Sequence, residues 1–197
     1  MPPSPPASIE RFRRVLSEHA RRRVPALLLA GLLCAGVAPG AHADALSRGT
    51  AAFDRGDYVR AFHDLAPLAY RGNARALGML GFMYEHGFGA PQAYDAAVDF
   101  YSQGAALGNP FAQAMLGLMY DKGHGVPQDF VLAYMWLNLA AAHTRGHERD
   151  AYTRFRDAVA SKMSTNEILV GQRLALNWTP IPLVPRVRRS REWLDPR

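Results

Sequence analysis

The segment LGLMYDKGHGVPQD occupies residues 116–129, and LGFMYEHGFGAPQA at residues 80–93 is its counterpart 36 residues earlier. The same offset pairs Gly72 with Gly108. Identities this numerous at one offset indicate an internal repeat. Residues 44–71 match only in part and lack the long Gly-Pro loop, so we interpret them as a diverged first copy.

Each copy predicts a pair of α-helices. Asn73 and Asn109 suit the N-cap position, because a side-chain oxygen there can accept hydrogen bonds from the first free backbone N–H groups. After Asn109, small and apolar side chains recur every fourth residue at Ala112, Leu116 and Tyr120, which is the spacing of one helix face. The same spacing precedes the loop of the earlier copy, so both copies begin with the same helix.

Glycines mark two further features of each first helix. Gly81 and Gly117 follow the repeated leucine, where a glycine should weaken a helix by about 1 kcal/mol relative to alanine. Their recurrence predicts that a second helix approaches too closely for a side chain. Gly87 and Gly123 are then predicted to end these helices in the left-handed conformation.

The second helices differ in their first residue. Asp129 is a good N-cap for the helix that follows it, but Ala93 occupies the equivalent place in the earlier copy, where we expect Asp95 to take over the capping. Further along, Ser164 or Thr165 followed by Glu167 indicates another helix start.

The motif L-G-x-x-Y-x-x-G-x-G-x-P-Q, followed by alanines at fixed distances, resembles the Sel1-like repeat (SLR) family. Residues 116–129 are a near-complete match and residues 80–92 are nearly as good. That family is an α/α solenoid related to tetratricopeptide repeats. The resemblance implies an all-α, right-handed solenoid of about three helix pairs plus a C-terminal capping pair over residues 44–178. Residues 163–178 resemble the closing helix after such arrays, where a final tryptophan packs the end.

Charge is divided unevenly along the chain. The 23 basic and 17 acidic residues of the whole chain give a net charge of +6, which alone would suggest a nucleic acid or an acidic membrane as partner. However, residues 1–43 carry +4, residues 44–178 carry −1 and residues 179–197 carry +3. The repeat domain is therefore nearly neutral, and we expect no nucleic-acid partner.

The first 43 residues have the pattern of a secretory signal peptide. Three arginines precede an apolar run at residues 24–38, and a small-residue A-x-A site ends at Ala43. The run is short for a bilayer-spanning helix, which needs about 20 residues. Cleavage after Ala43 would remove Cys34, the single cysteine, and leave no stable membrane anchor. We expect a periplasmic or secreted protein; the alternative is anchoring through uncleaved residues 24–38.

Residues 179–197 form a tail rich in proline and arginine, without a helix or strand period, so we expect it to be disordered. One interpretation is a solvated tail. The other is a site for an anionic polymer, peptidoglycan or an acidic polysaccharide. The residues of that candidate site are Arg186, Arg188, Arg189 and Arg191.

The candidate protein-binding surface is a stripe of methionines on the first helices. Met79 and Met83 recur at Met115 and Met119, off the face defined by the alanine, leucine and tyrosine. The resemblance implies that first helices line the concave side, where flexible methionines can receive a partner. The alternative is that these methionines pack neighbouring first helices together. The expected surface comprises Met79, Met83, His86, Met115, Met119 and Lys122.

No catalytic, metal or cofactor site is expected. His143 and His147 have a spacing that can hold zinc, but Gly146 interrupts the helix between them and no glutamate lies beside His143. The glycines of the two loops lack the preceding strand of a phosphate-binding motif. The resemblance implies a non-enzymatic scaffold that binds another protein, and the leader pattern leads us to expect that partner in the cell envelope. The alternatives are a binder of peptidoglycan or exopolysaccharide in envelope assembly and, more remotely, a wall-directed hydrolase.

Overall fold

The computed structural model describes residues 39–181, with side chains from residue 45 onward. Within that range the chain forms eight α-helices and no strand. They are arranged as four successive pairs: α2 (Pro39–Asp54) with α3 (Tyr58–Tyr70), α4 (Ala74–His86) with α5 (Tyr94–Ala106), α6 (Pro110–Lys122) with α7 (Phe130–Ala142), and α8 (Gly146–Ala160) with α9 (Thr165–Leu176).

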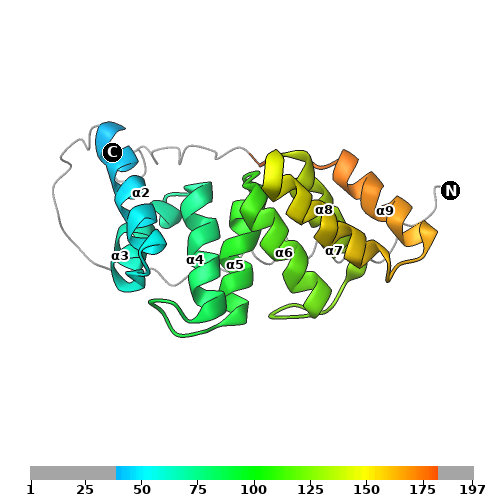
Figure 1. The fold of residues 1–197 in the computed structure, drawn as a ribbon, viewed down its shortest axis with the longest axis horizontal. Coiled ribbons are helices and arrows are strands. Elements are labelled where there is room, and N and C mark those ends of the chain that lie inside the picture. The colour runs from blue at the N-terminus through cyan, green and yellow to red at the C-terminus, as the bar shows by residue number, and fades with distance from the viewer. Residues whose placement is uncertain (1–38, 182–197) are drawn as a thin grey trace, which may run out of the picture.

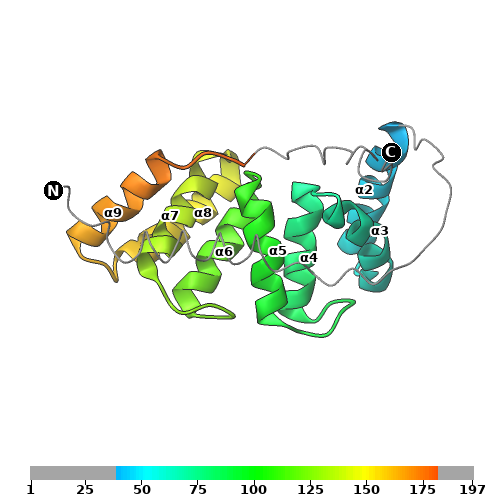
Figure 2. The same ribbon diagram turned by 180° about the vertical axis from the view of Figure 1, so that it is seen from behind.

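The pairs stack side by side into an elongated α/α solenoid, with α2 at one end and α9 at the other (Figures 1 and 2). The two helices pack against each other in the first three pairs, α3 contacts α4 and α5 contacts α6 across successive pairs, and both α8 and α9 pack against α7. This confirms the predicted fold class. The apolar run at residues 24–38 lies outside the described residues, and none of the helices formed by residues 39–181 is long and apolar enough to cross a membrane.

The predicted helix ends are confirmed in both central pairs. The Asn73 side chain accepts from the Ala76 N–H at 3.0 Å, and the Asn109 side chain accepts from the Ala112 N–H at 2.8 Å. Gly87 ends α4 with φ +71°, in the left-handed region that favours glycine. The corresponding glycine after α6 has the same φ. The repeated asparagines and glycines therefore set where the first helices begin and end.

Glycines within the first helices allow the second helices to pack closely. A β-carbon on Gly81 would lie 2.6 Å from the Tyr101 ring, and one on Gly117 would lie 2.8 Å from Leu137 Cγ. Gly49 in α2 stands in the same relation to Leu65, at 2.7 Å. The first pair thus uses the same packing as the later pairs although it lacks their long loop.

The second glycine of each loop packs against the preceding pair. A β-carbon on Gly89 would lie 2.5 Å from the Tyr58 carbonyl oxygen, where α3 begins, and one on Gly125 would lie 2.5 Å from the Tyr94 carbonyl oxygen, where α5 begins. Both glycines have a φ of about +70°. The Gly-Pro loop is therefore a contact between successive pairs as well as a turn within one pair.

The N-terminus of α5 differs from our expectation. Ala93 is the N-cap and provides no side-chain hydrogen bond, whereas Asp129 caps α7 by accepting from the N–H groups of Val131 and Leu132, both at 3.0 Å. Asp95 lies in the first turn of α5. There its negative charge interacts favourably with the helix dipole, but its side chain does not form the missing N-cap hydrogen bond.

Replacing Ala93 with aspartate is expected to stabilise the protein by about 1 kcal/mol, the usual difference between a capping residue and alanine. The backbone is already suitable, because Ala93 has φ −154° and ψ 105° and Asp129 has φ −151° and ψ 102°. Urea denaturation monitored by circular dichroism measures the change. Asp129→Ala is the matched control and should lower the free energy of unfolding by a similar amount. If Ala93→Asp leaves the free energy of unfolding unchanged, the capping argument is contradicted.

The last helix closes the array as the sequence predicts. Ser164 and Glu167 form a reciprocal capping box at the start of α9. Trp178 then packs its ring edge-on against Trp136 of α7, with ring centroids 6.0 Å apart. Residues 179–181, expected in the tail, also pack on the array: the Ile181 N–H donates to the Ala106 carbonyl at 2.8 Å.

Candidate functional site: a groove on the first helices

The first helices of all four pairs border one groove of about 470 Å³. Side chains from α2, α4, α6 and α8, or from the residues just before them, line it. The second helices α3, α5 and α7 contribute none of the lining residues. The groove therefore lies on the face formed by the first helices.

The floor of the groove is a row of aromatic rings. Phe53 of α2 lies edge-on to Phe82 of α4 with ring centroids 5.6 Å apart, and Phe82 lies 6.2 Å from Phe111 of α6. All three are half-buried. Met79 lies beside them, and Tyr152 of α8 completes the apolar lining. Aromatic side chains contribute a large apolar area where they reach a surface.

Charged and polar groups surround this floor. Asp54, Arg75 and Glu148 are exposed and give the rim a net charge of −1. The Thr50 hydroxyl is 3.8 Å from the Met79 sulfur, to which it donates. A groove with an apolar floor and a polar rim resembles a protein interface, in which the centre is apolar and the edge is wet.

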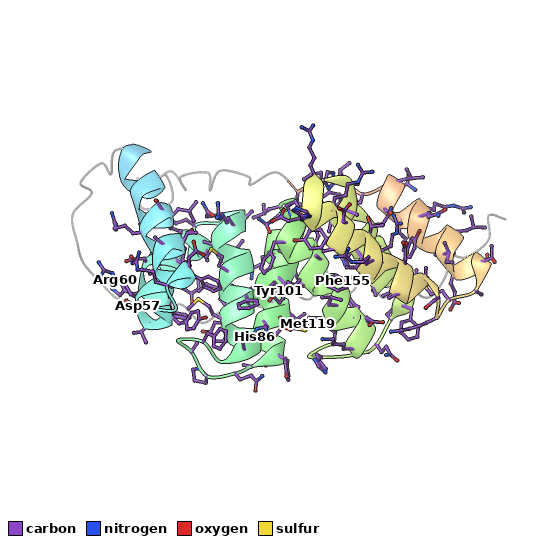
Figure 3. All side chains as sticks on the ribbon, viewed as in Figure 1. Asp57, Arg60, His86, Tyr101, Met119 and Phe155 are labelled. Atoms are coloured by element: carbon purple, nitrogen blue, oxygen red, sulfur yellow. The ribbon has the colours of Figure 1, made fainter. Side chains whose placement is uncertain are left out.

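The aromatic floor continues to the lower end of α4. His86 is exposed there, stacked on Phe82 with ring centroids 4.1 Å apart, and its Nδ1 lies 3.0 Å from the Phe82 carbonyl oxygen (Figure 3). Phe88 in the following loop stacks on Tyr58 at 4.3 Å. The exposed His86 ring therefore borders the groove floor through Phe82, without lining the groove itself.

The four methionines of the expected stripe do not share one surface. Met79 is half-buried and lines the groove, and Met115 is half-buried but lies outside it. Met83 and Met119 are 0% and 1% exposed, respectively, and belong to the core. Our expectation was wrong for these two, because α4 and α6 each contact helices on several sides and so bury more than one face.

The remaining expected site residues lie apart. Lys122 is exposed in the last turn of α6 and does not line the groove. The arginines of the expected polymer-binding site, Arg186, Arg188, Arg189 and Arg191, fall outside the described residues. Residues 39–181 hold no group of three or more histidine, cysteine, aspartate or glutamate side chains placed to bind a metal. His143 caps the end of α7 and His147 belongs to α8.

One partly buried polar contact links α4 to α5. The Tyr101 hydroxyl donates to Glu85 Oε2 at 2.8 Å, and burial, with the neighbouring carboxylate, raises the pKa of Tyr101. The ring is fully buried. This hydroxyl therefore stays protonated at physiological pH and fixes α5 against α4, behind the groove.

Two segments of the chain, residues 74–109 and 110–144, match the family model of the Sel1 repeat. Each matched segment contains one helix pair, α4–α5 and α6–α7, together with its Gly-Pro loop. The chain therefore contains two Sel1 repeats. Pairs α2–α3 and α8–α9, which lie outside the matched residues, extend this Sel1 array at both ends.

Solved structures show the same fold. The chain is similar to the crystal structure of c5321, a protective antigen present in uropathogenic Escherichia coli strains that displays an SLR fold, with a TM-score of 0.64 and 21% identity over 70% of this chain and 29% of that chain. It is also similar to a Sel1 repeat protein from Oxalobacter formigenes, with a TM-score of 0.54 and 23% identity over 68% and 56%. The chain thus spans less than two thirds of either structure.

A sequence search of curated proteins gives no significant match. Sel1 repeat proteins are generally protein-interaction scaffolds and typically non-catalytic. The groove on the first helices is the feature of this array that is suited to such an interaction.

Proposed function

We propose that this chain is a non-enzymatic scaffold of the bacterial cell envelope that binds a segment of another protein in the groove of its first helices. The observation that carries this proposal is the row formed by Phe53, Phe82 and Phe111 on the floor of a groove shared by four helix pairs. Apolar surface that gathers in one groove with a polar rim is typical of interaction sites.

Different groups of the groove determine how tightly the partner binds and how it is oriented. Burial of apolar side chains of the partner on the phenylalanine rings supplies most of the binding free energy, as aromatic centres do at interfaces. The rim charges of Asp54, Arg75 and Glu148 are exposed to solvent, so they contribute mainly to the rate and the orientation of docking.

The proposed location in the envelope is supported by the leader pattern of residues 1–43. Cleavage after Ala43 would remove the first five residues of α2, which begins at Pro39, and leave Asp44 as the new N-terminus. N-terminal sequencing of the protein recovered from the producing bacterium tests this. A first residue at Asp44 supports export with cleavage, whereas an intact N-terminus in the membrane fraction supports anchoring through residues 24–38.

Met79→Glu is expected to abolish capture of the partner from envelope extracts, because it places a carboxylate beside the apolar floor. Met115→Glu is the matched control: Met115 occupies the equivalent position 36 residues later and is also half-buried, but it does not line the groove. Crosslinking followed by pull-down with both variants measures the effect, after circular dichroism confirms that both are folded. Equal loss in the two variants, or no loss in either, would contradict the groove as the binding site.

The alternative function is binding of peptidoglycan or an exopolysaccharide, which the arginines of residues 186–191 favour by their charge. Sedimentation with purified peptidoglycan tests it. Binding of the polymer would be supported, and the scaffold proposal weakened, if the protein co-sediments with peptidoglycan and loses this ability when four arginines are replaced with glutamine. These are Arg186, Arg188, Arg189 and Arg191. Release of soluble fragments from the peptidoglycan would contradict the non-enzymatic role.

A further inference from the structure

After α9 the chain turns back along the array. Trp178 contacts Trp136 and His143 at the end of α7, and a β-carbon on Gly108 would lie 3.5 Å from Pro180. The Ile181 N–H then donates to the Ala106 carbonyl at the end of α5. The segment crosses from α9 to the turn between α5 and α6 (Figure 1). Ile181, the last described residue, therefore lies near the middle of the array.

That turn lies at the edge of the groove. Asn109 and Pro110, which line the groove, directly follow Gly108, the residue that Pro180 approaches. The 16 residues beyond Ile181 can reach about 50 Å if extended at about 3.1 Å per residue. Four first helices packed side by side at about 10 Å span about 30 Å. The tail is thus long enough to cross the whole groove.

The chemistry of the tail complements the groove. Residues 182–197 contain five arginines against Glu192 and Asp195, and carry the apolar pair Trp193 and Leu194 near the end. The groove offers an aromatic floor and a rim of net charge −1. Tryptophan and arginine are both enriched among the few residues that contribute most of the binding free energy at protein interfaces.

We propose that residues 182–197 occupy the groove of their own chain, with Trp193 on the rings of Phe82 and Phe111 and the arginines beside Asp54 and Glu148. This rests on the groove being the binding surface of the proposed function. A tail tethered at the edge of the groove has an effective concentration in the millimolar range. A partner protein must therefore displace the tail before it can bind.

A photoreactive residue at position 193 tests the proposal. Full-length protein carrying p-benzoylphenylalanine in place of Trp193 is irradiated at low micromolar concentration, and crosslinks are mapped by mass spectrometry. We expect crosslinks within one chain to the segment of α4 around Met79 and Phe82. As a control, p-benzoylphenylalanine in place of Leu169, which is exposed on α9, should give no crosslink to the groove. Crosslinks only between two chains, or none to the groove, would overturn the proposal.

A peptide competition gives a second readout. A synthetic peptide of residues 182–197 is expected to bind full-length Trp193→Ala protein at least about tenfold more tightly than wild-type protein, because the tethered tail no longer competes. When Asp54→Lys and Glu148→Lys are added to the Trp193→Ala protein, its binding of the peptide should weaken. Equal affinity for both proteins would overturn the proposal, as would binding of the peptide to peptidoglycan alone. Neither experiment needs the partner protein, so failure to find a partner would affect only the proposed function.

Discussion

Replacing Gly125 with alanine is expected to lower the free energy of unfolding by about 3 kcal/mol. Gly125 has φ +69°, and a left-handed conformation costs a residue with a β-carbon about 1–2 kcal/mol. The new β-carbon would also lie 2.5 Å from the Tyr94 carbonyl oxygen and 3.0 Å from the Asp95 nitrogen. Both contacts are backbone, so the loop must move away from the preceding pair, at a further cost of about 1–3 kcal/mol. Urea denaturation measures the loss.

Gly123→Ala is the control within the same loop. Gly123 has φ +71°, but a β-carbon there would meet its nearest neighbour, Gln128, at 3.4 Å, which is an ordinary contact. Only the conformational cost of about 1–2 kcal/mol should appear. Gly89→Ala should reproduce the larger loss, because the same contact with Tyr58 exists one pair earlier. Equal losses for Gly123→Ala and Gly125→Ala would show that the loop does not connect successive pairs.

Tyr101→Ala is expected to lower the free energy of unfolding by about 3–5 kcal/mol, as for other large buried aromatic residues. The ring is 0% exposed and lies directly over Gly81, so its removal leaves a cavity between α4 and α5. The hydrogen bond from the Tyr101 hydroxyl to Glu85 is lost as well. Tyr101→Phe removes only that hydrogen bond and should lose about 1 kcal/mol.

Gly81 and Tyr101 together give a test in which one substitution destabilises the wild-type protein but stabilises a variant. In the wild-type background Gly81→Ala should destabilise by about 1–3 kcal/mol, because the β-carbon overlaps the Tyr101 ring. In the Tyr101→Ala background the space is vacant, and the better helix propensity of alanine should make the same change stabilising by up to about 1 kcal/mol. A double-mutant cycle measures both values. Gly81→Ala that stabilises the wild-type protein would refute the close approach of the two helices.

The fold could be predicted in detail because its determinants are local and repeated. Asn73 and Asn109 cap helices through their own side chains, and Gly87 and Gly123 end them through their own backbone conformation. Features of this kind depend on a few neighbouring residues and recur at one offset. The exception is the start of α5, where the repeat is broken at Ala93 and no side chain of the first turn replaces the cap.

The groove could be predicted only in part. The groove lies on the first helices, where we expected the binding surface, but the methionine pattern does not distinguish a core position such as Met119 from a groove position such as Met79. Phe82 and Phe111 were not predicted, since they occupy different positions of the repeat: the offset of 36 places Leu118 opposite Phe82 and Arg75 opposite Phe111. A surface built from non-equivalent positions leaves no periodic signal in the sequence.

The sequence by itself determined the helices, their ends and their pairing, because capping, glycine conformation and close helix approach are properties of single repeats. The tertiary structure alone decided which faces stay open. Burial depends on how neighbouring pairs stack, and that stacking covers Met83 and Met119 but leaves Phe53, Phe82 and Phe111 along one groove. It also brings Ile181 back to Ala106, a contact across 75 positions that follows from packing of the last helix.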